Sequence, residues 1–126
     1  MALRTSVVLG VLILCGLVCV CAADISGKWA TEFDSQVGLQ KYTFEFKVNG
    51  TSLTGKALSN IAGADAESEI TEGKIDGNSV TFVENLKYQG MDLRIEYKGT
   101  VAGDEIKFSR TVAGQEGETF TAKRVK

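Results

Sequence analysis

The sequence predicts an all-β domain of eight antiparallel strands, an up-and-down meander closed into a small barrel, after an N-terminal signal peptide. Apolar and polar residues alternate with a period of two along most of the chain, which is typical of strands with one buried face. A tight-hairpin pattern occurs three times, around Gly50-Thr51, Gly77-Asn78 and Gly103-Asp104. Each hairpin is predicted to place a glycine opposite a phenylalanine, which favours a bent sheet. A β-sandwich is the alternative architecture.

The first 22 residues are predicted to be a secretory signal peptide. An apolar run extends from Val7 to Val20, after one arginine, and small residues follow before the polar Asp24. This order of basic, apolar and small-residue regions is the layout of a cleavable leader. We therefore expect an exported protein, periplasmic or extracellular, with residues 24–126 as a single barrel domain. An uncleaved anchor is one alternative, since the run is close to the shortest length that spans a bilayer. A lipidated cysteine is the other, since cysteines lie near the end of the leader.

The rest of the chain divides into strands by its period-two pattern. The predicted strands are 27–33, 41–48, 52–59, 67–75, 79–88, 91–101, 105–112 and 118–125. Strand 41–48 alternates most clearly, with Phe44 and Phe46 on the face that points inward. Residues 60–66 are predicted to form a loop and residues 113–117 a glycine-bearing turn.

The three hairpin turns predict the register of the strands that they join. A glycine followed by a small polar residue suits a type II′ turn, whose first residue has a positive φ angle. The resulting glycine–phenylalanine pairs are Gly55 with Phe46, Gly73 with Phe82 and Gly99 with Phe108. Glycine allows a sharp bend and the facing ring covers the exposed backbone, so the three pairs favour a barrel. An eight-stranded barrel is either filled by its own side chains or holds one small ligand.

Composition limits the chemistry of the domain. The chain has no histidine, and Cys15, Cys19 and Cys21 all lie in the predicted leader. We therefore expect no metal, no cofactor and no Ser-His or Cys-His nucleophile pair in the barrel. The net charge of −2 is scattered in sign, which argues against nucleic acid as a partner, and a membrane is expected only through an uncleaved leader. A non-catalytic domain is the main prediction, and a carboxylate-based hydrolase that uses Glu84 is the alternative.

Strand parity places two charged residues inside the predicted barrel. Glu84 and Arg110 share the inward face of their strands, and their predicted hairpin partners are Thr71 and Tyr97. An unpaired buried charge is very costly. The two charges therefore either contact a ligand near the barrel mouth, with Thr71, Tyr88 and Tyr97 as neighbours, or form an internal ion pair. The first hypothesis predicts a domain that binds a small molecule or carbohydrate, and the second predicts a filled core and a structural or protein-interaction module.

Trp29 is the single tryptophan and lies on the inward face of the first predicted strand. It could close one end of the barrel or stack on a sugar ring. Gly27-Lys28-Trp29, together with Arg124 near the end of the chain, resembles the calycin pattern of lipocalins and avidins. The resemblance implies that Trp29 and Arg124 form a structural pair that closes the barrel. The biotin-binding tryptophans of avidins and the T-D-Y motif of lipocalins are absent, so no ligand is implied.

A second resemblance covers nearly all of residues 24–126. The segments ISGKW, KYTFEFKVNG, DGNSVTF and GDEIKF resemble a family of short secreted bacterial β-domains of uncharacterised function. Some members of that family are appended to exported carbohydrate-active enzymes. The resemblance implies an exported β-domain and favours an accessory role related to such enzymes.

Overall fold

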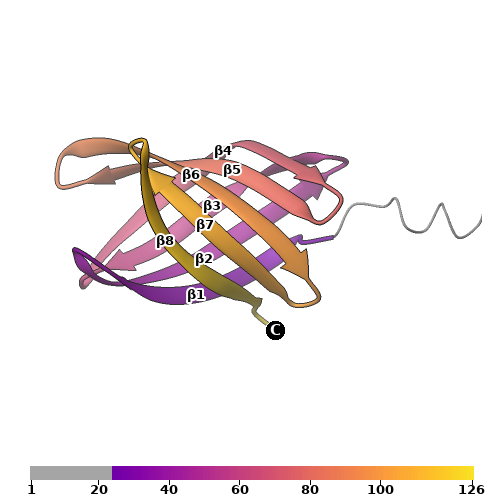
Figure 1. Ribbon diagram of the computed structural model, residues 1–126, viewed down its shortest axis with the longest axis horizontal. Helices are drawn as coiled ribbons and strands as arrows, with labels where there is room; N and C mark the ends of the chain where they lie inside the picture. Colours follow the sequence, from indigo (N-terminus) through magenta and orange to yellow (C-terminus); the bar gives the residue numbers. More distant parts are fainter. Residues whose placement is uncertain (1–23) are drawn as a thin grey trace, which may run out of the picture.

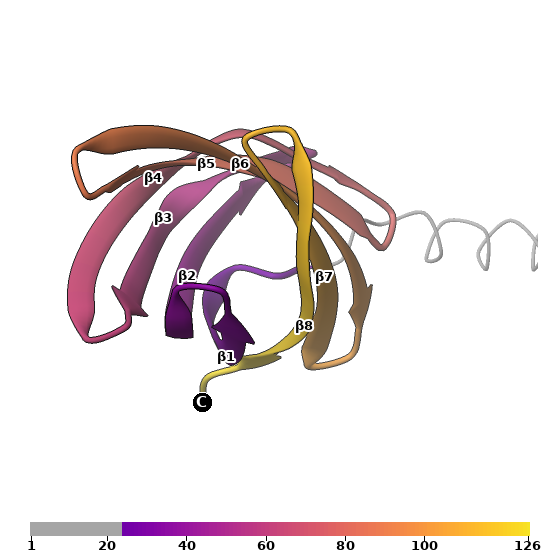
Figure 2. The ribbon, with the colours of Figure 1, turned by 60° about the vertical axis from the view of Figure 1, so that its left-hand side comes forward.

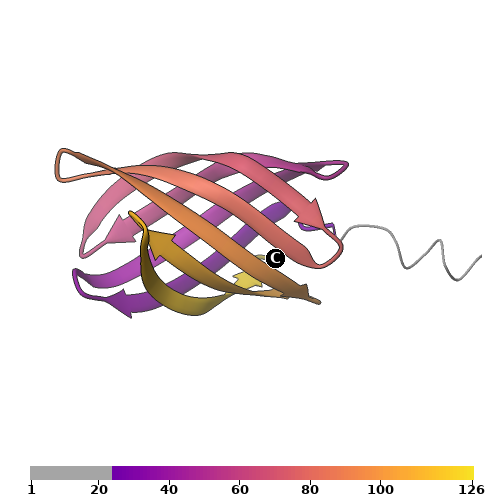
Figure 3. The same ribbon diagram turned by 45° about the horizontal axis from the view of Figure 1, so that its top comes forward.

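The protein is an eight-stranded antiparallel barrel in a computed structural model that describes residues 24–126 (Figure 1). The strands are β1 Gly27–Ser35, β2 Gly38–Asn49, β3 Ser52–Ile61, β4 Ala64–Asp76, β5 Ser79–Tyr88, β6 Met91–Ala102, β7 Glu105–Val112 and β8 Gln115–Arg124. Each strand pairs with the next, and β8 returns to β1. The strands are inclined to the long axis of the barrel (Figure 3), as closure of a sheet requires. The predicted closed meander is confirmed, and the predicted signal peptide with its three cysteines lies outside the described residues.

The turns at one end of the barrel begin with glycine. They join β2 to β3, β4 to β5 and β6 to β7. The φ angles are 65° at Gly50, 61° at Gly77 and 63° at Gly103. A positive φ at the first turn residue agrees with the predicted type II′ turns. We call this the closed end, because β1 and β8 are paired here.

Three of the four described turns at the other end, which we call the open end, place glycine second, and the fourth is Gln36-Val37 between β1 and β2. In Ala62-Gly63, Gln89-Gly90 and Ala113-Gly114, both residues have positive φ angles, as in type I′ turns. The predicted loop over residues 60–66 was therefore wrong, and the turn predicted over 113–117 was too long. Both are two-residue connections, because a left-handed residue followed by glycine reverses the chain directly.

Aromatic side chains fill the middle of the barrel. Phe44, Phe46, Phe82, Tyr97 and Phe108 are each at most 5% exposed. The rings of Phe82 and Tyr97 stack with their centroids 4.5 Å apart, and the ring centroid of Phe44 lies 5.6 to 5.7 Å from those of the other four members of this group. Such close aromatic contacts leave this part of the interior filled by the protein itself.

Two of the three predicted glycine–phenylalanine pairs are present. Gly55 pairs with Phe46, and Gly99 pairs with Phe108. A Cβ atom at Gly99 would lie 2.6 Å from the Phe108 ring, so glycine is required where the ring covers the backbone. At the third position the register of β4 on β5 shifts, so that Glu72 and Gly73 together stand opposite Phe82 instead of Gly73 alone.

A β-bulge in β4 causes that shift. Glu72 has a φ angle of 52°. The residues of β4 that precede Glu72 pair with β5 in a register that differs by one residue from the predicted one. Ile70, rather than Thr71, is therefore the partner of Glu84. Because a shift of one residue exchanges the two faces of a strand, Thr71 lies on the outer face of the barrel.

The barrel closes over a short distance. β1 pairs with β2 along its whole length, but within the described residues it shares only the pairs Trp29–Arg124 and Ala30–Lys123 with β8. Figure 2 shows β8 rising away from β1 as it approaches the β7–β8 turn. The edges of the two strands are therefore apart at the open end.

Side chains continue the junction beyond the last backbone pair. The hydroxyl of Thr31 donates a hydrogen bond to the Thr121 carbonyl oxygen at 2.9 Å. The ring of Phe33 stacks on that of Phe120 with centroids 4.5 Å apart. These contacts separate the filled middle of the barrel from the open end.

Candidate functional site

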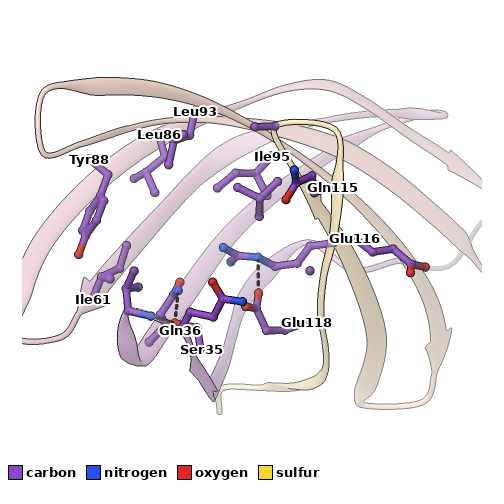
Figure 4. Close-up of a pocket in the computed structure, with 16 residues that line it drawn as sticks. Ser35, Gln36, Ile61, Leu86, Tyr88, Leu93, Ile95, Gln115, Glu116 and Glu118 are labelled. Carbon is purple, nitrogen blue, oxygen red and sulfur yellow. Dashed lines mark hydrogen bonds and ion pairs between the residues drawn. The ribbon is translucent and has the colours of Figure 1, made fainter.

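A cleft of about 400 Å³ lies at the open end, where β1 and β8 have separated (Figure 4). Its apolar wall is formed by Ile61, Leu86, Leu93, Ile95 and Val112. Its polar side includes Ser35, Gln40, Arg110, Glu116 and Glu118. Figure 4 shows Leu86, Leu93 and Ile95 across the opening from Ser35 and Glu118. The interior is therefore filled in its middle and hollow at one end, a combination that neither predicted alternative contained.

Glu84 is fully buried and accepts two hydrogen bonds from tyrosines. The Tyr97 hydroxyl donates to its Oε1 at 2.7 Å, and the Tyr42 hydroxyl donates to its Oε2 at 3.3 Å. The predicted inward position of Glu84 is confirmed. Burial raises the pKa of Glu84, although the tyrosine hydrogen bonds and Arg110 act in the opposite direction. Glu84 does not line the cleft.

Arg110 lies between this buried group and the cleft. It is 5% exposed, and its Nη1 donates to the Tyr97 hydroxyl at 3.2 Å. Its Nε lies 3.1 Å from Oε1 of Glu118. The inward position of Arg110 and its pairing with Tyr97 are confirmed. The predicted direct pair with Glu84 is replaced by a chain, because the Tyr97 hydroxyl stands between the two charges.

Three aromatic rings surround the Arg110 guanidinium. Its central carbon lies 5.0 Å from the ring centroid of Phe33, 5.6 Å from that of Tyr42 and 5.7 Å from that of Tyr97. A cation within about 6 Å of a ring face is attracted to it. Burial opposes the charge, but the two tyrosines and Glu118 outweigh burial and raise the pKa of Arg110. Arg110 is therefore charged, and its guanidinium is held among these rings in the interior of the barrel.

A second register shift brings Glu118 to Arg110. The pairing of β7 with β8 changes register around Arg110, so that Gly117 and Glu118 both stand opposite this residue. A Cβ atom at Gly117 would lie 3.1 Å from the Arg110 carbonyl oxygen, which is closer than side chains normally approach. Glu118 was missed as a site residue, although it shares the sequence parity of the inward Phe120.

Gln40 presents a free carbonyl oxygen beside the cleft. It is 4% exposed, and its Nε2 donates to the Ser35 hydroxyl oxygen at 2.8 Å. The single proton of that hydroxyl goes to the Gly38 carbonyl oxygen, also at 2.8 Å, so Ser35 can only accept from Gln40. The Gln40 amide is thereby oriented, and its Oε1 has no hydrogen-bond partner among residues 24–126. The sequence contains no signal that distinguishes Gln40 as a site residue.

The five residues predicted to bind a ligand thus do not form a single site. Glu84 and Tyr97 are buried in the hydrogen-bonded network, Arg110 connects that network to the cleft, and Tyr88 lines the cleft. Thr71 does not join them, because the β4 bulge turns it outward, where Asn85 donates a hydrogen bond to its hydroxyl at 3.4 Å. The predicted position of Thr71 was therefore wrong.

Trp29 and Arg124 form the predicted pair at the closed end. The Arg124 guanidinium carbon lies 4.5 Å from the ring centroid of Trp29, and the indole N–H donates to the Ile25 carbonyl oxygen at 2.8 Å. Arg124 also pairs with Asp104 at 3.1 Å. Trp29 is 0% exposed, so the alternative in which it stacks on a sugar was wrong.

No protein family, curated protein or solved structure matches this chain. The described residues also contain no group of three acidic, histidine or cysteine side chains that could hold a metal ion. They include no helix of the length and apolar character needed to cross a membrane.

Proposed function

We propose that the barrel binds a small amphipathic molecule in the cleft at its open end. The main evidence is the Oε1 atom of Gln40, which is buried and has no hydrogen-bond partner among the described residues. Such an acceptor destabilises the folded protein unless a ligand or water molecule donates a hydrogen bond to it. The facing wall of Leu86, Leu93 and Ile95 suits an apolar ligand body. A volume of about 400 Å³ lies within the range of small-molecule sites.

An amphipathic molecule is favoured over a carbohydrate. Sugars are commonly held by stacking on aromatic faces, and Tyr88 supplies the one aromatic ring that lines the cleft in residues 24–126. The protein would act outside the cytoplasm, as the leader-like composition of residues 1–22 favours. It would act by binding rather than by catalysis, with the Arg110 network as a rigid floor.

Binding of N-phenyl-1-naphthylamine, a neutral fluorescent probe with apolar rings, tests the proposal. We expect its fluorescence to rise on addition of the purified protein. Leu93→Arg, which places a charge in the apolar wall, should weaken binding at least about tenfold, or about 1.4 kcal/mol. Leu39→Arg is the matched control, because Leu39 is 42% exposed and does not line the cleft.

Two results would overturn the proposal. One is no rise in fluorescence with the folded wild-type protein, which would favour an interaction module instead. The other is an equal loss of binding in Leu93→Arg and Leu39→Arg, since the probe would then bind elsewhere.

A further inference from the structure

Buried polar atoms that lack a hydrogen bond gather in the cleft. Among residues 24–126, four buried side-chain atoms have no hydrogen-bond partner. Three of them, Gln40 Oε1, Arg110 Nε and Glu118 Oε1, belong to residues that line the cleft. Two of these atoms are acceptors and one is an N–H donor. Such atoms are rare in folded proteins, so their presence in one cleft favours a ligand group that can both donate and accept hydrogen bonds.

Ser35 determines that Gln40 presents an acceptor. The Ser35 hydroxyl oxygen accepts hydrogen bonds from Gln40 Nε2 at 2.8 Å and from the Val37 backbone N–H at 3.3 Å. Its own proton goes to the Gly38 carbonyl oxygen, so Ser35 has no proton left to donate to Gln40. A ligand that reaches Gln40 Oε1 must therefore supply an N–H or O–H group.

Arg110 and Glu118 attract each other as charges but are not aligned for a hydrogen bond. Arg110 Nε lies 3.1 Å from Glu118 Oε1, yet neither atom has a hydrogen-bond partner within the described part of the chain. The Nε–H group therefore does not point at this oxygen. A third group placed beside the pair could accept a hydrogen bond from Nε and donate one to Oε1.

The charges that face the cleft are balanced. Arg110 and Glu118 neutralise each other. Glu116 is exposed, and Figure 4 shows its carboxylate directed away from the opening. The other polar side chains of the lining are uncharged, namely Ser35, Gln36, Gln40, Tyr88 and Gln115. An ionic head group would lose its hydration in the cleft without an unpaired opposite charge to replace it, so neither a cation nor an anion is favoured.

We propose that the cleft selects an uncharged amphiphile whose polar end both donates and accepts hydrogen bonds, such as a primary alkanamide. The amide N–H groups would donate to Gln40 Oε1 and Glu118 Oε1, and the amide carbonyl oxygen would accept from Arg110 Nε. The alkyl chain would lie on the apolar wall of the cleft. This inference rests on the proposed function, because it names the class of ligand for the same cleft.

Displacement of N-phenyl-1-naphthylamine by four ligands of equal chain length tests the inference at pH 7. Octanamide offers donors and an acceptor, methyl octanoate offers acceptors only, and octylammonium and octanoate are charged. We expect octanamide to bind at least about tenfold more tightly than each of the other three. A cleft with apolar contacts alone would instead favour methyl octanoate, because an ester is less strongly hydrated than an amide. Direct titration calorimetry gives the same ranking without the probe.

Variants locate the preference. Gln40→Leu removes the free acceptor and should weaken octanamide binding by about tenfold. It should not weaken the binding of methyl octanoate, which has no proton to donate and therefore also reports whether the variant is folded. Glu118→Gln removes the charge that balances Arg110 and should shift the preference towards octanoate. Glu105→Gln is the matched control, because Glu105 is an exposed carboxylate at the closed end, and it should leave the ranking unchanged.

The outcomes separate the two hypotheses. Octanamide binding no tighter than that of methyl octanoate, or tighter binding of either charged ligand, would overturn the inference and leave the proposed function standing. Unchanged octanamide binding in Gln40→Leu would also overturn it, as would an equal effect of Glu105→Gln and Glu118→Gln on octanoate binding. Failure of all four ligands and of the probe to bind would reject the proposed function itself.

Discussion

Replacement of Arg110 by methionine would remove the only positive charge in the buried network while retaining most of its apolar volume. Glu84 is 0% exposed and would be left without a cation nearby. The Tyr97 hydroxyl would lose the N–H group that donates to it at 3.2 Å. Glu118 would lose its partner at 3.1 Å. Arg110→Met therefore leaves two carboxyl groups uncompensated in or near the interior.

The expected cost follows from this loss. Removal of one partner from a buried charge pair destabilises a protein by about 3–5 kcal/mol. The free energy of unfolding of a domain is typically about 5–15 kcal/mol, so Arg110→Met should bring the barrel close to its limit of stability. Addition of Glu84→Gln should restore part of the loss, with a coupling energy of about 1–3 kcal/mol, because it neutralises the carboxyl group that Arg110→Met leaves buried.

Urea unfolding followed by the fluorescence of Trp29 measures these effects. Trp29 is the single tryptophan and lies at the closed end, remote from Arg110, so it reports global unfolding. Arg94→Met is the matched control. Arg94 pairs with Glu72 at 2.8 Å, but both side chains are more than half exposed, and such a pair contributes about 0–1 kcal/mol. A cost for Arg110→Met no larger than that of Arg94→Met, or strict additivity with Glu84→Gln, would refute the reasoning.

Two further predictions concern Glu84 and Trp29. Burial raises the pKa of Glu84 above its ordinary value of 4.5, so the folded state holds this proton more tightly than the unfolded state. The contribution of Glu84 to stability is therefore fully present below pH 4.5 and declines as the pH rises to the raised pKa. Urea unfolding from pH 4 to pH 8 should show this decline in the wild type and less of it in Glu84→Gln; parallel profiles would contradict it. Trp29→Phe should cost about 1–3 kcal/mol, because the Ile25 carbonyl oxygen loses its donor. Thermal unfolding by circular dichroism would show this loss, and an unchanged melting temperature would exclude a structural role for the indole N–H group.

Local sequence rules were sufficient for the hairpins and for the two central charges. A two-residue turn depends on the φ angles of its own residues, so Gly50, Gly77 and Gly103 could be recognised without knowledge of the rest of the chain. From those turns, strand parity placed Glu84 and Arg110 inside. It also paired Arg110 with Tyr97, since no bulge intervenes between β6 and β7.

The bulges and the opening were decided by the tertiary structure. β4 pairs with both β3 and β5, and its register shifts next to Glu72 against each of these strands. This β-bulge turns the side chain of Thr71 outward. The shift in β8 opposite Arg110 brings Glu118 to the guanidinium. A β-bulge inserts one extra residue into one strand of a pair and so changes the register of that pair. Whether an extra residue is needed depends on pairing with strands that are distant in sequence.

The sequence by itself determined an eight-stranded meander with two inward charges, while the Trp29–Arg124 pair was implied by a resemblance to the calycin pattern. The tertiary structure alone decided that β1 and β8 separate beyond Ala30 and Lys123, so that a cleft opens beside Gln40. The physical reason is that alternation of apolar and polar residues records which face of a strand is buried. It does not record how far the first and last strands remain paired around a closed barrel.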